Sequence, residues 1–131
     1  IQQRSEKKYH SPGMWANTCC GHPYPGETLE GAAHRRLREE MGCDAQLAKA
    51  FSFIYKCEFE NGLTENEYDY VLIGKWDGEP KKNPDEAADY KWISKDTLEE
   101  DIKKNPDKYT LWFKIAWEKL NNSIGIRYLS Y

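Results

Sequence analysis

The sequence lacks long apolar runs. No stretch approaches the roughly 18 apolar residues that a membrane-spanning helix needs, and the start, Ile1 to His10, is too charged to be the apolar part of a signal peptide. There is also no internal repeat and no low-complexity segment. These absences predict a cytoplasmic globular protein without a membrane partner.

Cysteine is also scarce. Four cysteines in 131 residues are too few for a disulfide scaffold, and no two of them are spaced C-x-x-C. A zinc knuckle and a thioredoxin motif are therefore excluded. We expect reduced thiols, with a disulfide between the adjacent Cys19 and Cys20 as the minor alternative.

An excess of positive charge is missing as well. The chain carries 19 Lys and Arg against 22 Asp and Glu, a net charge of -3, so it offers no basic surface for nucleic acid. With 39% hydrophobic and 31% charged residues it has the composition of a globular protein, and we expect one domain over residues 1–131, as a monomer or weak dimer. Because the chain begins with Ile1 and not Met, we also expect an upstream segment.

One helix is predicted by periodicity. Apolar residues recur every four positions at Leu29, Ala33, Leu37 and Met41. Thr28 can cap the N-terminus and Gly42 can end the helix, which predicts a helix over Leu29 to Met41.

The following segments favour strands and then helices. Leu47 to Phe59 and Glu65 to Trp76 are rich in aromatic and β-branched residues and flank the turn signal Asn61-Gly62, which predicts an antiparallel pair. Ala87 to Ile93 resembles a short strand. Ser94 is a candidate N-cap for a helix through Lys104, and Leu111 to Leu120 predicts a last helix. The fold class is therefore α/β (α+β), a mixed, mostly antiparallel sheet flanked by helices.

A phosphate-binding motif lies at the first helix. Gly21 is followed after five residues by Glu27 and after seven more by the run Arg35 to Cys43. This spacing resembles the Nudix box, Gly-x5-Glu-x7-Arg-Glu-U-x-Glu-Glu-x-Gly-U, and the resemblance implies a Nudix fold whose loop and helix bind a diphosphate and its divalent cation. The alternative is a solvated, salt-bridged helix.

One position departs from that pattern. Arg36 stands where pyrophosphohydrolases of the family have Glu, so a carboxylate ligand is replaced by a cation. A guanidinium can bind a diphosphate through two hydrogen bonds, which suits an enzyme that keeps the diphosphate and acts on the other end of its substrate.

A second stretch of the sequence resembles a narrower group of proteins. The run Asn17-Thr18-Cys19-Cys20-Gly21-His22-Pro23 resembles the active-site segment of the type I isopentenyl-diphosphate isomerase family. Glu65-Asn66-Glu67, Tyr55, Trp112 and the start of the chain match that family too. The resemblance implies the reversible conversion of isopentenyl diphosphate to dimethylallyl diphosphate by protonation to a tertiary carbocation and deprotonation.

The resemblance also implies roles for single residues. Cys20 and Glu67 would transfer protons, Tyr55 would assist Glu67, and the ring face of Trp112 would stabilise the carbocation. From the residues alone, the alternative for Cys20 is a small buried hydrophobe, although its place beside Gly21 and His22 in a loop favours function. Tyr55 and Trp112 could be core residues.

The resemblance also implies which residues bind the metal and which bind the diphosphate. His22, Glu65 and Glu67 would hold one tightly bound divalent metal (Mn²⁺, Zn²⁺ or Mg²⁺), completed in the family by two histidines from the region before Ile1. Glu40 would bind a Mg²⁺ that bridges to the diphosphate. The residues expected to clamp the diphosphate are Arg4, Lys8 and Arg36.

We predict no functional role for the remaining candidate residues. We interpret His10 and His34 as ordinary surface or helix histidines, Cys19 as buried, and Trp76, Trp92 and Trp117 as core. Two rival functions stay open: a Nudix pyrophosphohydrolase acting on nucleoside diphosphate derivatives, and an inactive diphosphate-binding domain.

Overall fold

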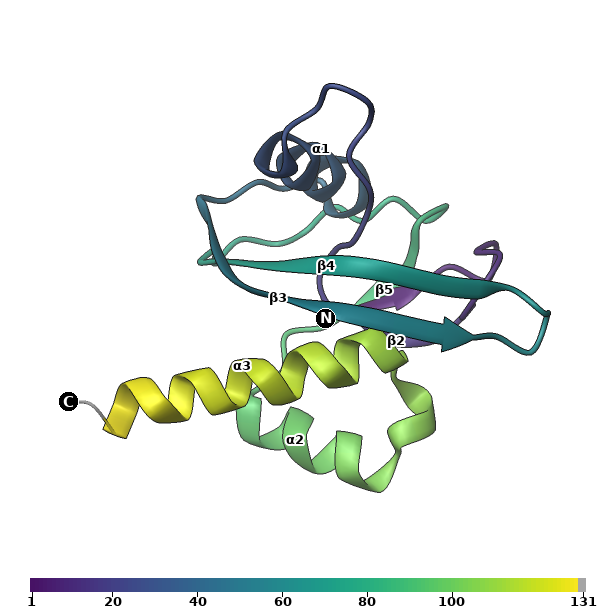
Figure 1. The fold of residues 1–131 in the computed structure, drawn as a ribbon. Helices are drawn as coiled ribbons and strands as arrows, with labels where there is room; N and C mark the ends of the chain where they lie inside the picture. Colours follow the sequence, from purple (N-terminus) through teal and green to yellow (C-terminus); the bar gives the residue numbers. More distant parts are fainter. Residues whose placement is uncertain (130–131) are drawn as a thin grey trace.

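The computed structural model describes residues 1–129. Five strands, two shorter helical segments and two longer helices follow one another along the chain (Figure 1). The elements are β1 (Gln2–Arg4), β2 (Trp15–Ala16), α1 (Leu29–Met41), β3 (Leu47–Glu58), β4 (Thr64–Gly74), β5 (Ala87–Tyr90), α2 (Lys95–Lys104), η1 (Pro106–Lys108) and α3 (Leu111–Leu129).

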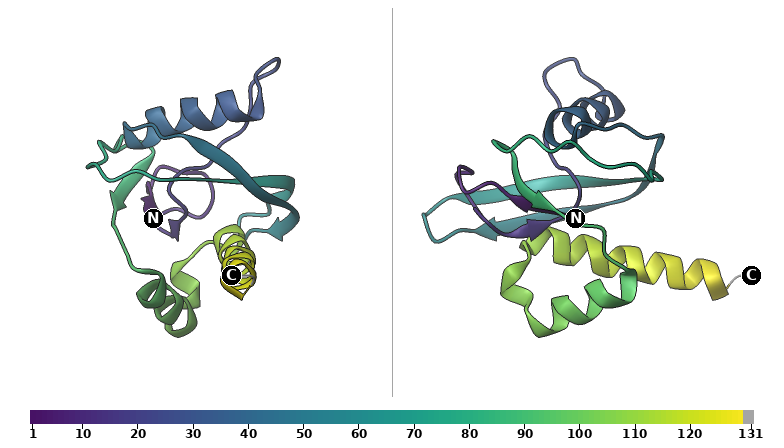
Figure 2. Two further views of the ribbon diagram at one scale, coloured as in Figure 1. Left: turned by 90° about the vertical axis from the view of Figure 1, so that its left-hand side faces the viewer. Right: turned by 180° about the vertical axis from the view of Figure 1, so that it is seen from behind.

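The strands form two antiparallel sheets. One has the order β2-β1-β5 and the other is the hairpin β3-β4. Figures 1 and 2 show α1 on one side of the hairpin and α2 with α3 on the other. The predicted α+β class with a mostly antiparallel arrangement is thus confirmed, although the strands divide into two sheets and do not make one.

Helix α1 has the predicted bounds because its end signals are local. The Thr28 hydroxyl accepts a hydrogen bond from the Gly31 N–H at 3.0 Å, which satisfies one free donor of the first turn. Gly42 ends the helix with φ of 61°, a left-handed conformation that glycine adopts without strain, and its N–H donates to the Arg38 carbonyl. Leu37 and Met41 are buried, as the periodicity predicts.

The β3-β4 hairpin sets the register on which the site depends. Tyr55 pairs with Glu67, and Cys57 pairs with Glu65. Residues directly opposite in an antiparallel pair point to the same face. The hairpin therefore brings Tyr55, Glu65 and Glu67 to one face.

The C-terminal half follows the prediction with two differences. Helix α2 begins after Ser94, whose Oγ accepts from the Thr97 N–H, and ends at Lys104, as expected. Strand β5 ends at Tyr90, three residues early, and α3 continues to Leu129, nine residues beyond the predicted end. Among the residues described, no helix combines the length and the apolar character needed to cross a bilayer.

The main apolar core lies where β2, α2 and the start of α3 meet. It is formed by the buried residues Ala16, Leu98, Tyr109 and Phe113, and Trp117 packs against it. The prediction that Trp92 is a core residue is wrong: its side chain is 61% exposed and stacks on the half-buried Trp76 with ring centroids 6.4 Å apart. Two rings at the surface can bury each other's faces without entering the core.

Candidate active site

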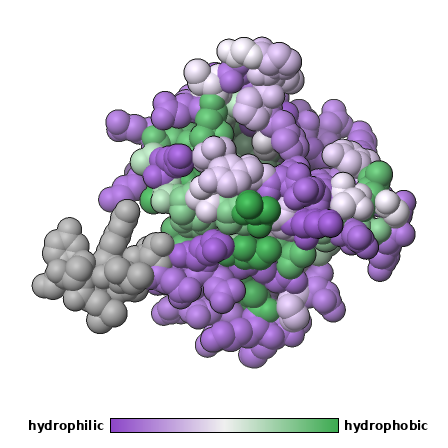
Figure 3. Space-filling view, in the orientation of Figure 1, coloured by the Kyte–Doolittle hydropathy of each residue, from purple (hydrophilic) through white to green (hydrophobic). Residues whose placement is uncertain are grey.

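One cavity of about 1070 Å³ opens between α1, the hairpin and α3. Its lining includes most of the predicted site residues: Arg4, Lys8, Cys20, His22, Arg36, Glu65, Glu67 and Trp112. Leu29, Ala33 and Val71 are among its apolar walls. Figure 3 shows apolar side chains gathered in the middle of one face of the molecule, with hydrophilic ones above and below.

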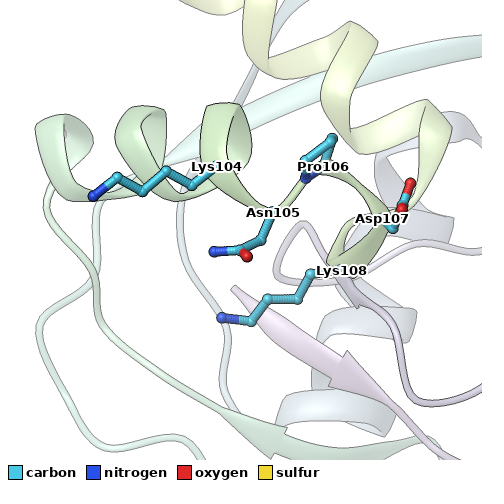
Figure 4. Close-up of a pocket in the computed structure, with 5 residues that line it drawn as sticks. All are labelled: Lys104, Asn105, Pro106, Asp107 and Lys108. Atoms are coloured by element: carbon cyan, nitrogen blue, oxygen red, sulfur yellow. The ribbon is translucent and has the colours of Figure 1, made fainter.

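A second hollow, of about 550 Å³, lies at the turn between α2 and α3 (Figure 4). Its lining consists of the exposed residues 104–108 of that turn, and it contains none of the predicted site residues. Lys104, Asn105 and Lys108 extend to one side of it. We therefore place the candidate active site in the larger cavity.

The loop after β2 carries the cysteines to this cavity. The Asn17 side-chain amide donates to the Cys19 carbonyl at 2.6 Å, and the Gln2 amide donates to the Thr18 carbonyl at 2.7 Å. The loop is thus anchored through its backbone, so Cys20 lines the cavity in a fixed place.

The Cys20 thiol is protonated at neutral pH. Burial and the nearby Glu40 carboxylate raise the pKa of Cys20 to about 12. Burial also raises the pKa of Cys19, which packs beside the α1 cluster of Leu37 and Met41. Cys20 therefore brings a neutral S–H, and not a thiolate, to the cavity of the free protein.

A cluster of paired charges lies at the α1 end of the cavity, where the resemblance predicts the diphosphate. Arg36 Nη2 donates to Glu40 Oε1 at 2.6 Å and to Glu86 Oε2 at 3.1 Å, and Arg36 Nη1 donates to Glu39 Oε2 at 2.6 Å. Lys8 forms an ion pair with the same Glu86 carboxylate. Lys8 and Arg36, two of the three residues predicted to clamp the diphosphate, are thus brought together through Glu86.

Glu86 was missed in the sequence. It lies just before β5 in a polar segment, and its position between Lys8 and Arg36 depends on contacts far apart in the chain. Glu40 is 3% exposed and also accepts from the Gln2 amide; burial raises its pKa, opposed by Gln2 and Arg36. Glu40 and Glu86 both converge on Arg36, as Glu39 does, so the cations of this end are already paired before any ligand binds.

Arg4 lies apart from the Lys8 and Arg36 cluster. It is buried, its guanidinium is 5.1 Å from the centroid of the Trp112 ring, and its Nη2 donates to the His10 carbonyl at 3.2 Å. None of its described contacts is with Lys8 or Arg36. Its place over the ring shows that Trp112 has a face that accommodates a cation.

Strand β4 presents a row of carboxylates to the cavity. Glu65, Glu67 and Asp69 alternate along the strand and line the same space. Burial, followed by the negative charge of Glu67, raises the pKa of Glu65, and the same two causes, together with a hydrogen bond to Glu67, raise the pKa of Asp69 to about 7. Asp69 was not predicted, although the spacing Glu-x-Glu-x-Asp was visible in the sequence.

These donors fit a divalent cation only in part. His22 Nε2 lies 2.9 Å from Glu67 Oε1, so two of the three predicted ligands touch. Within residues 1–129, however, no three His, Cys, Asp or Glu side chains converge closely enough to form a ready-made metal centre. The donor chemistry still suits a divalent cation, because imidazole and carboxylate oxygens bind Zn²⁺ and Mn²⁺ and a cation would offset the mutual repulsion of the carboxylates.

The interpretation of His10 as a surface or helix histidine is wrong. His10 lies in the loop between β1 and β2 and is 7% exposed, and its Nε2 is 2.7 Å from Glu65 Oε1. His34, in contrast, lies on α1 as predicted and pairs with Asp44. Sequence alone did not separate the two because the partner of His10 is on a distant strand.

Two aromatic side chains pack against each other at the site: Trp112 lines the cavity, and Tyr55 lies behind it and is not among the lining residues. Tyr55 is 1% exposed, its ring centroid is 6.3 Å from that of Trp112, and its hydroxyl has no hydrogen-bond partner within the described residues. Burial raises the pKa of Tyr55, so its phenol stays protonated. Trp112 is held by a hydrogen bond from its Nε1 to Asn17 Oδ1 at 3.1 Å. An unpaired buried hydroxyl is costly unless another group meets it.

Arg35 orients the loop that carries His22. Its guanidinium donates to both Glu27 oxygens, at 2.8 and 2.9 Å, and to the His22 carbonyl at 3.1 Å. Arg35 and Glu27, the Arg and Glu of the Nudix-box spacing, therefore hold the loop in place and do not line the cavity. Their pairing fixes the backbone of His22 while leaving its ring exposed.

Comparison with known proteins identifies the family. The NUDIX domain profile matches residues 1–113. The chain is 49% identical over 120 residues to "Isopentenyl-diphosphate Delta-isomerase 2" of Aromatoleum aromaticum and 55% identical over 114 residues to the protein of that name from Photorhabdus laumondii, covering 92% and 87% of this chain. It spans 64% of the length of each of these two relatives.

A further relative and a solved structure agree. "Isopentenyl-diphosphate Delta-isomerase 1" of A. aromaticum is 45% identical over 92% of this chain and 68% of its own. A crystal structure from Deinococcus radiodurans shares the fold, with a TM-score of 0.65 at 24% identity over 80% of this chain and 64% of that one. The chain therefore belongs to the Nudix family and, within it, to the type I isopentenyl-diphosphate Delta-isomerase group.

Proposed function

We propose that the protein interconverts isopentenyl diphosphate and dimethylallyl diphosphate. The observation that carries the proposal is that a neutral thiol, Cys20, and a carboxylate, Glu67, line one largely apolar cavity together with the ring of Trp112. An allylic shift needs two proton-transfer groups and an unreactive surface for the cation between them. The names of the relatives support the same substrate class.

The proton inventory of the reaction balances. One group adds a proton to the terminal CH₂ carbon of isopentenyl diphosphate, which places the positive charge on the tertiary carbon. The other group removes a proton from the CH₂ carbon on the diphosphate side, and the double bond forms between these last two carbons. Cys20 and Glu67 exchange these roles when the reaction runs in the opposite direction. Nothing is hydrolysed and no external oxidant is needed.

Tyr55 and Trp112 support these steps. The unpaired Tyr55 hydroxyl lies on the face that carries Glu67 and can assist its proton transfer. The Trp112 ring stabilises the carbocation without forming a bond to it. In the free protein the same ring lies beside the Arg4 guanidinium, which supports its suitability for positive charge.

The diphosphate would bind at the α1 end. Lys8 and Arg36 supply cations there, Arg4 extends the positive lining, and Glu40 would hold a Mg²⁺ that bridges to the phosphate oxygens. Because the Arg36 pairs with Glu40 and Glu86 are made in the free protein, the ligand must compete with these carboxylates.

A divalent metal would be held at the β4 end by His22, Glu65 and Glu67. Bound there, it would supply positive charge that offsets the clustered carboxylates. Its identity as Mn²⁺, Zn²⁺ or Mg²⁺, a cytoplasmic location, a single domain over residues 1–131 and a monomer or weak dimer stay predictions.

The two rivals make different predictions. A pyrophosphohydrolase would need a carboxylate where Arg36 pairs with Glu40, and an inactive binding domain would not need a protonated Cys20 on the cavity wall. Incubating the protein with isopentenyl diphosphate and Mg²⁺ separates them. The proposal predicts dimethylallyl diphosphate without inorganic phosphate; phosphate release would favour the hydrolase, and an unchanged substrate would favour the binding domain.

A further inference from the structure

We propose that Asn17 is a positioning residue that fixes the Trp112 ring and the loop carrying Cys20 relative to each other. The inference rests on the proposed function, because the ring and the thiol are the groups that would face the carbocation. It assigns a role to a side chain that the sequence places beside the cysteines without indicating a function for it.

The Asn17 side chain contacts both the ring and the loop. Its Oδ1 accepts a hydrogen bond from Trp112 Nε1 at 3.1 Å, and its Nδ2 donates to the Cys19 carbonyl at 2.6 Å. An indole N–H can only donate and a carbonyl oxygen can only accept, so the amide has one possible orientation. One end of the amide therefore holds the ring, and the other end holds the loop.

The backbone next to this contact is joined as well. Asn17 directly follows β2, and Trp112 is the second residue of α3. The Thr110 N–H donates to the Trp15 carbonyl at 2.9 Å, so the chain is hydrogen-bonded two residues before each of the two side chains. The bond between Asn17 and Trp112 therefore extends a fixed junction between β2 and α3 and sets where the ring lies on it.

Two amides hold the loop from opposite sides. The Gln2 amide donates to the Thr18 carbonyl at 2.7 Å and also to a carboxylate of α1. The Asn17 amide donates to the next carbonyl, that of Cys19, and accepts from α3. Cys20 follows directly in the chain. Loss of the Asn17 bonds would release the loop on the α3 side only, away from the end of the cavity where the diphosphate is expected.

The alignment matters because an aromatic ring attracts a cation through its face. The ring edge carries partial positive charge, so a turned ring would repel the carbocation. The rings of His10 and Tyr55 stand at 84° and 77° to that of Trp112 and limit its tilt. The N–H is the single hydrogen-bonding group of the indole, so Asn17 is its directional contact. A misplacement of about 1 Å can cost about 100-fold in rate.

Two substitutions of Asn17 and one control separate these contacts. Asn17→Leu keeps much of the volume and loses both hydrogen bonds. Asn17→Asp keeps an oxygen for Trp112 and loses the donor to Cys19. Gln3→Leu is the matched control, because the Gln3 amide also donates to a loop carbonyl, that of Gly13 at 3.0 Å, but does not line the cavity.

Kinetics of the full-length protein with isopentenyl diphosphate and Mg²⁺ give the first test. We expect Asn17→Leu to lower kcat by about 10- to 100-fold, with KM changed by less than about threefold. Asn17→Asp should lower kcat less, and Gln3→Leu should leave it near the wild-type value. A wild-type kcat in Asn17→Leu, or a loss confined to KM, would overturn the proposal. If Asn17→Leu does not fold, a wild-type kcat in Asn17→Asp has the same effect.

A double-mutant cycle distinguishes positioning from a general loss of structure. In the Trp112→Phe background the ring has no N–H, so Asn17→Leu has only the loop bond left to break. The double variant should therefore lose less kcat than the product of the two single losses, by about threefold or more. Single losses that multiply in full would show that Asn17 does not act through the ring.

The indole N–H resonance of Trp112 separates this inference from the proposed function. In ¹H–¹⁵N spectra of the substrate-free protein it is assigned by its loss in Trp112→Phe. It should move and exchange faster with solvent in Asn17→Leu, and stay hydrogen-bonded in Asn17→Asp and Gln3→Leu. An unchanged resonance in Asn17→Leu would overturn the inference even if the wild type is active. The expected resonances in a wild type that does not isomerise isopentenyl diphosphate would overturn the function and leave Asn17 as the anchor of the ring.

Discussion

The two ends of the cavity handle charge in opposite ways. At the α1 end, Arg36 is paired with Glu39, Glu40 and Glu86, so each of these charges has a partner of opposite sign before a ligand arrives. On β4, Glu65 and Asp69 crowd around Glu67 and their pKa values are raised. At the α1 end the charges are paired in the free protein, whereas at the β4 end neighbouring carboxylates repel one another.

The difference indicates what each end contributes. A cluster of paired charges holds its side chains in place, and a bound diphosphate would replace carboxylates as the partner of Arg36 and Lys8. A row of carboxylates is stable only when a proton or a cation relieves it, so the β4 end depends on metal and pH. We therefore expect that the proposed diphosphate binding at the α1 end and the proposed proton transfer by Glu67 at the β4 end can be disturbed separately.

The largest expected effect is on proton transfer. Cys20→Ala and Glu67→Gln should each lower the turnover of isopentenyl diphosphate by about 100-fold or more while the fold is kept, because each removes a general acid-base group. Cys19→Ala is the matched control, since it removes the adjacent, partly buried thiol that packs beside α1. Near-normal turnover by Cys20→Ala would contradict the assignment.

The second largest effect is on the stability of the charge cluster at the α1 end of the cavity. Arg36→Gln leaves the buried Glu40 carboxylate without its cation, so we expect the free energy of unfolding in urea to fall by about 2 kcal/mol. Arg38→Gln on the same helix breaks only the exposed pair with Asp44 and should cost less than about 0.5 kcal/mol. Equal losses would show that the α1 cluster is no more than surface charge.

Trp112 tests the stabilisation of the carbocation. Trp112→Phe keeps an aromatic face and should cost about 1 kcal/mol of activation free energy, roughly fivefold in turnover. Trp112→Leu keeps bulk without the ring and should lower turnover further, with little change in KM. Equal turnover in the two variants would assign Trp112 to packing alone.

The smallest effect is on stability at the carboxylate end. The pKa of Asp69, about 7, lies above its ordinary value near 4, so the folded protein binds the extra proton between these pH values. Stability from this group is therefore present at acidic pH and is lost as the pH rises towards 7. Asp69→Asn should raise the stability of the metal-free protein at pH 8 by less than about 1 kcal/mol. Added Mn²⁺ should reduce this difference in stability between the variant and the wild type. A loss of stability at pH 8 would mean that Asp69 is not repelled by its neighbours.

The sequence predicted those parts of the molecule whose signals are local. Thr28 and Gly42 fixed both ends of α1, and Asn61-Gly62 with its flanking apolar runs fixed the hairpin. Cys20 and Glu67 were predicted from motifs and lie on the same cavity, although their chemical roles remain proposals.

What the sequence did not predict depends on contacts between distant segments. His10 is buried only because Phe59 and Trp112 enclose it, and Glu86 joins the site only because β5 brings it to Lys8. Trp92 was expected in the core because of its residue type, but the chain places it at the surface against Trp76. No local pattern distinguishes these positions from ordinary loop residues.

The central claim is that two separate groups move protons while the diphosphate stays intact. Conversion of isopentenyl diphosphate in D₂O with Mg²⁺, followed by mass spectrometry and NMR of the product, tests it most directly. We predict dimethylallyl diphosphate with solvent deuterium in a methyl group and no inorganic phosphate, because the donor exchanges its proton with solvent and the acceptor is a different residue. Release of phosphate, or a product formed without deuterium, would contradict the account.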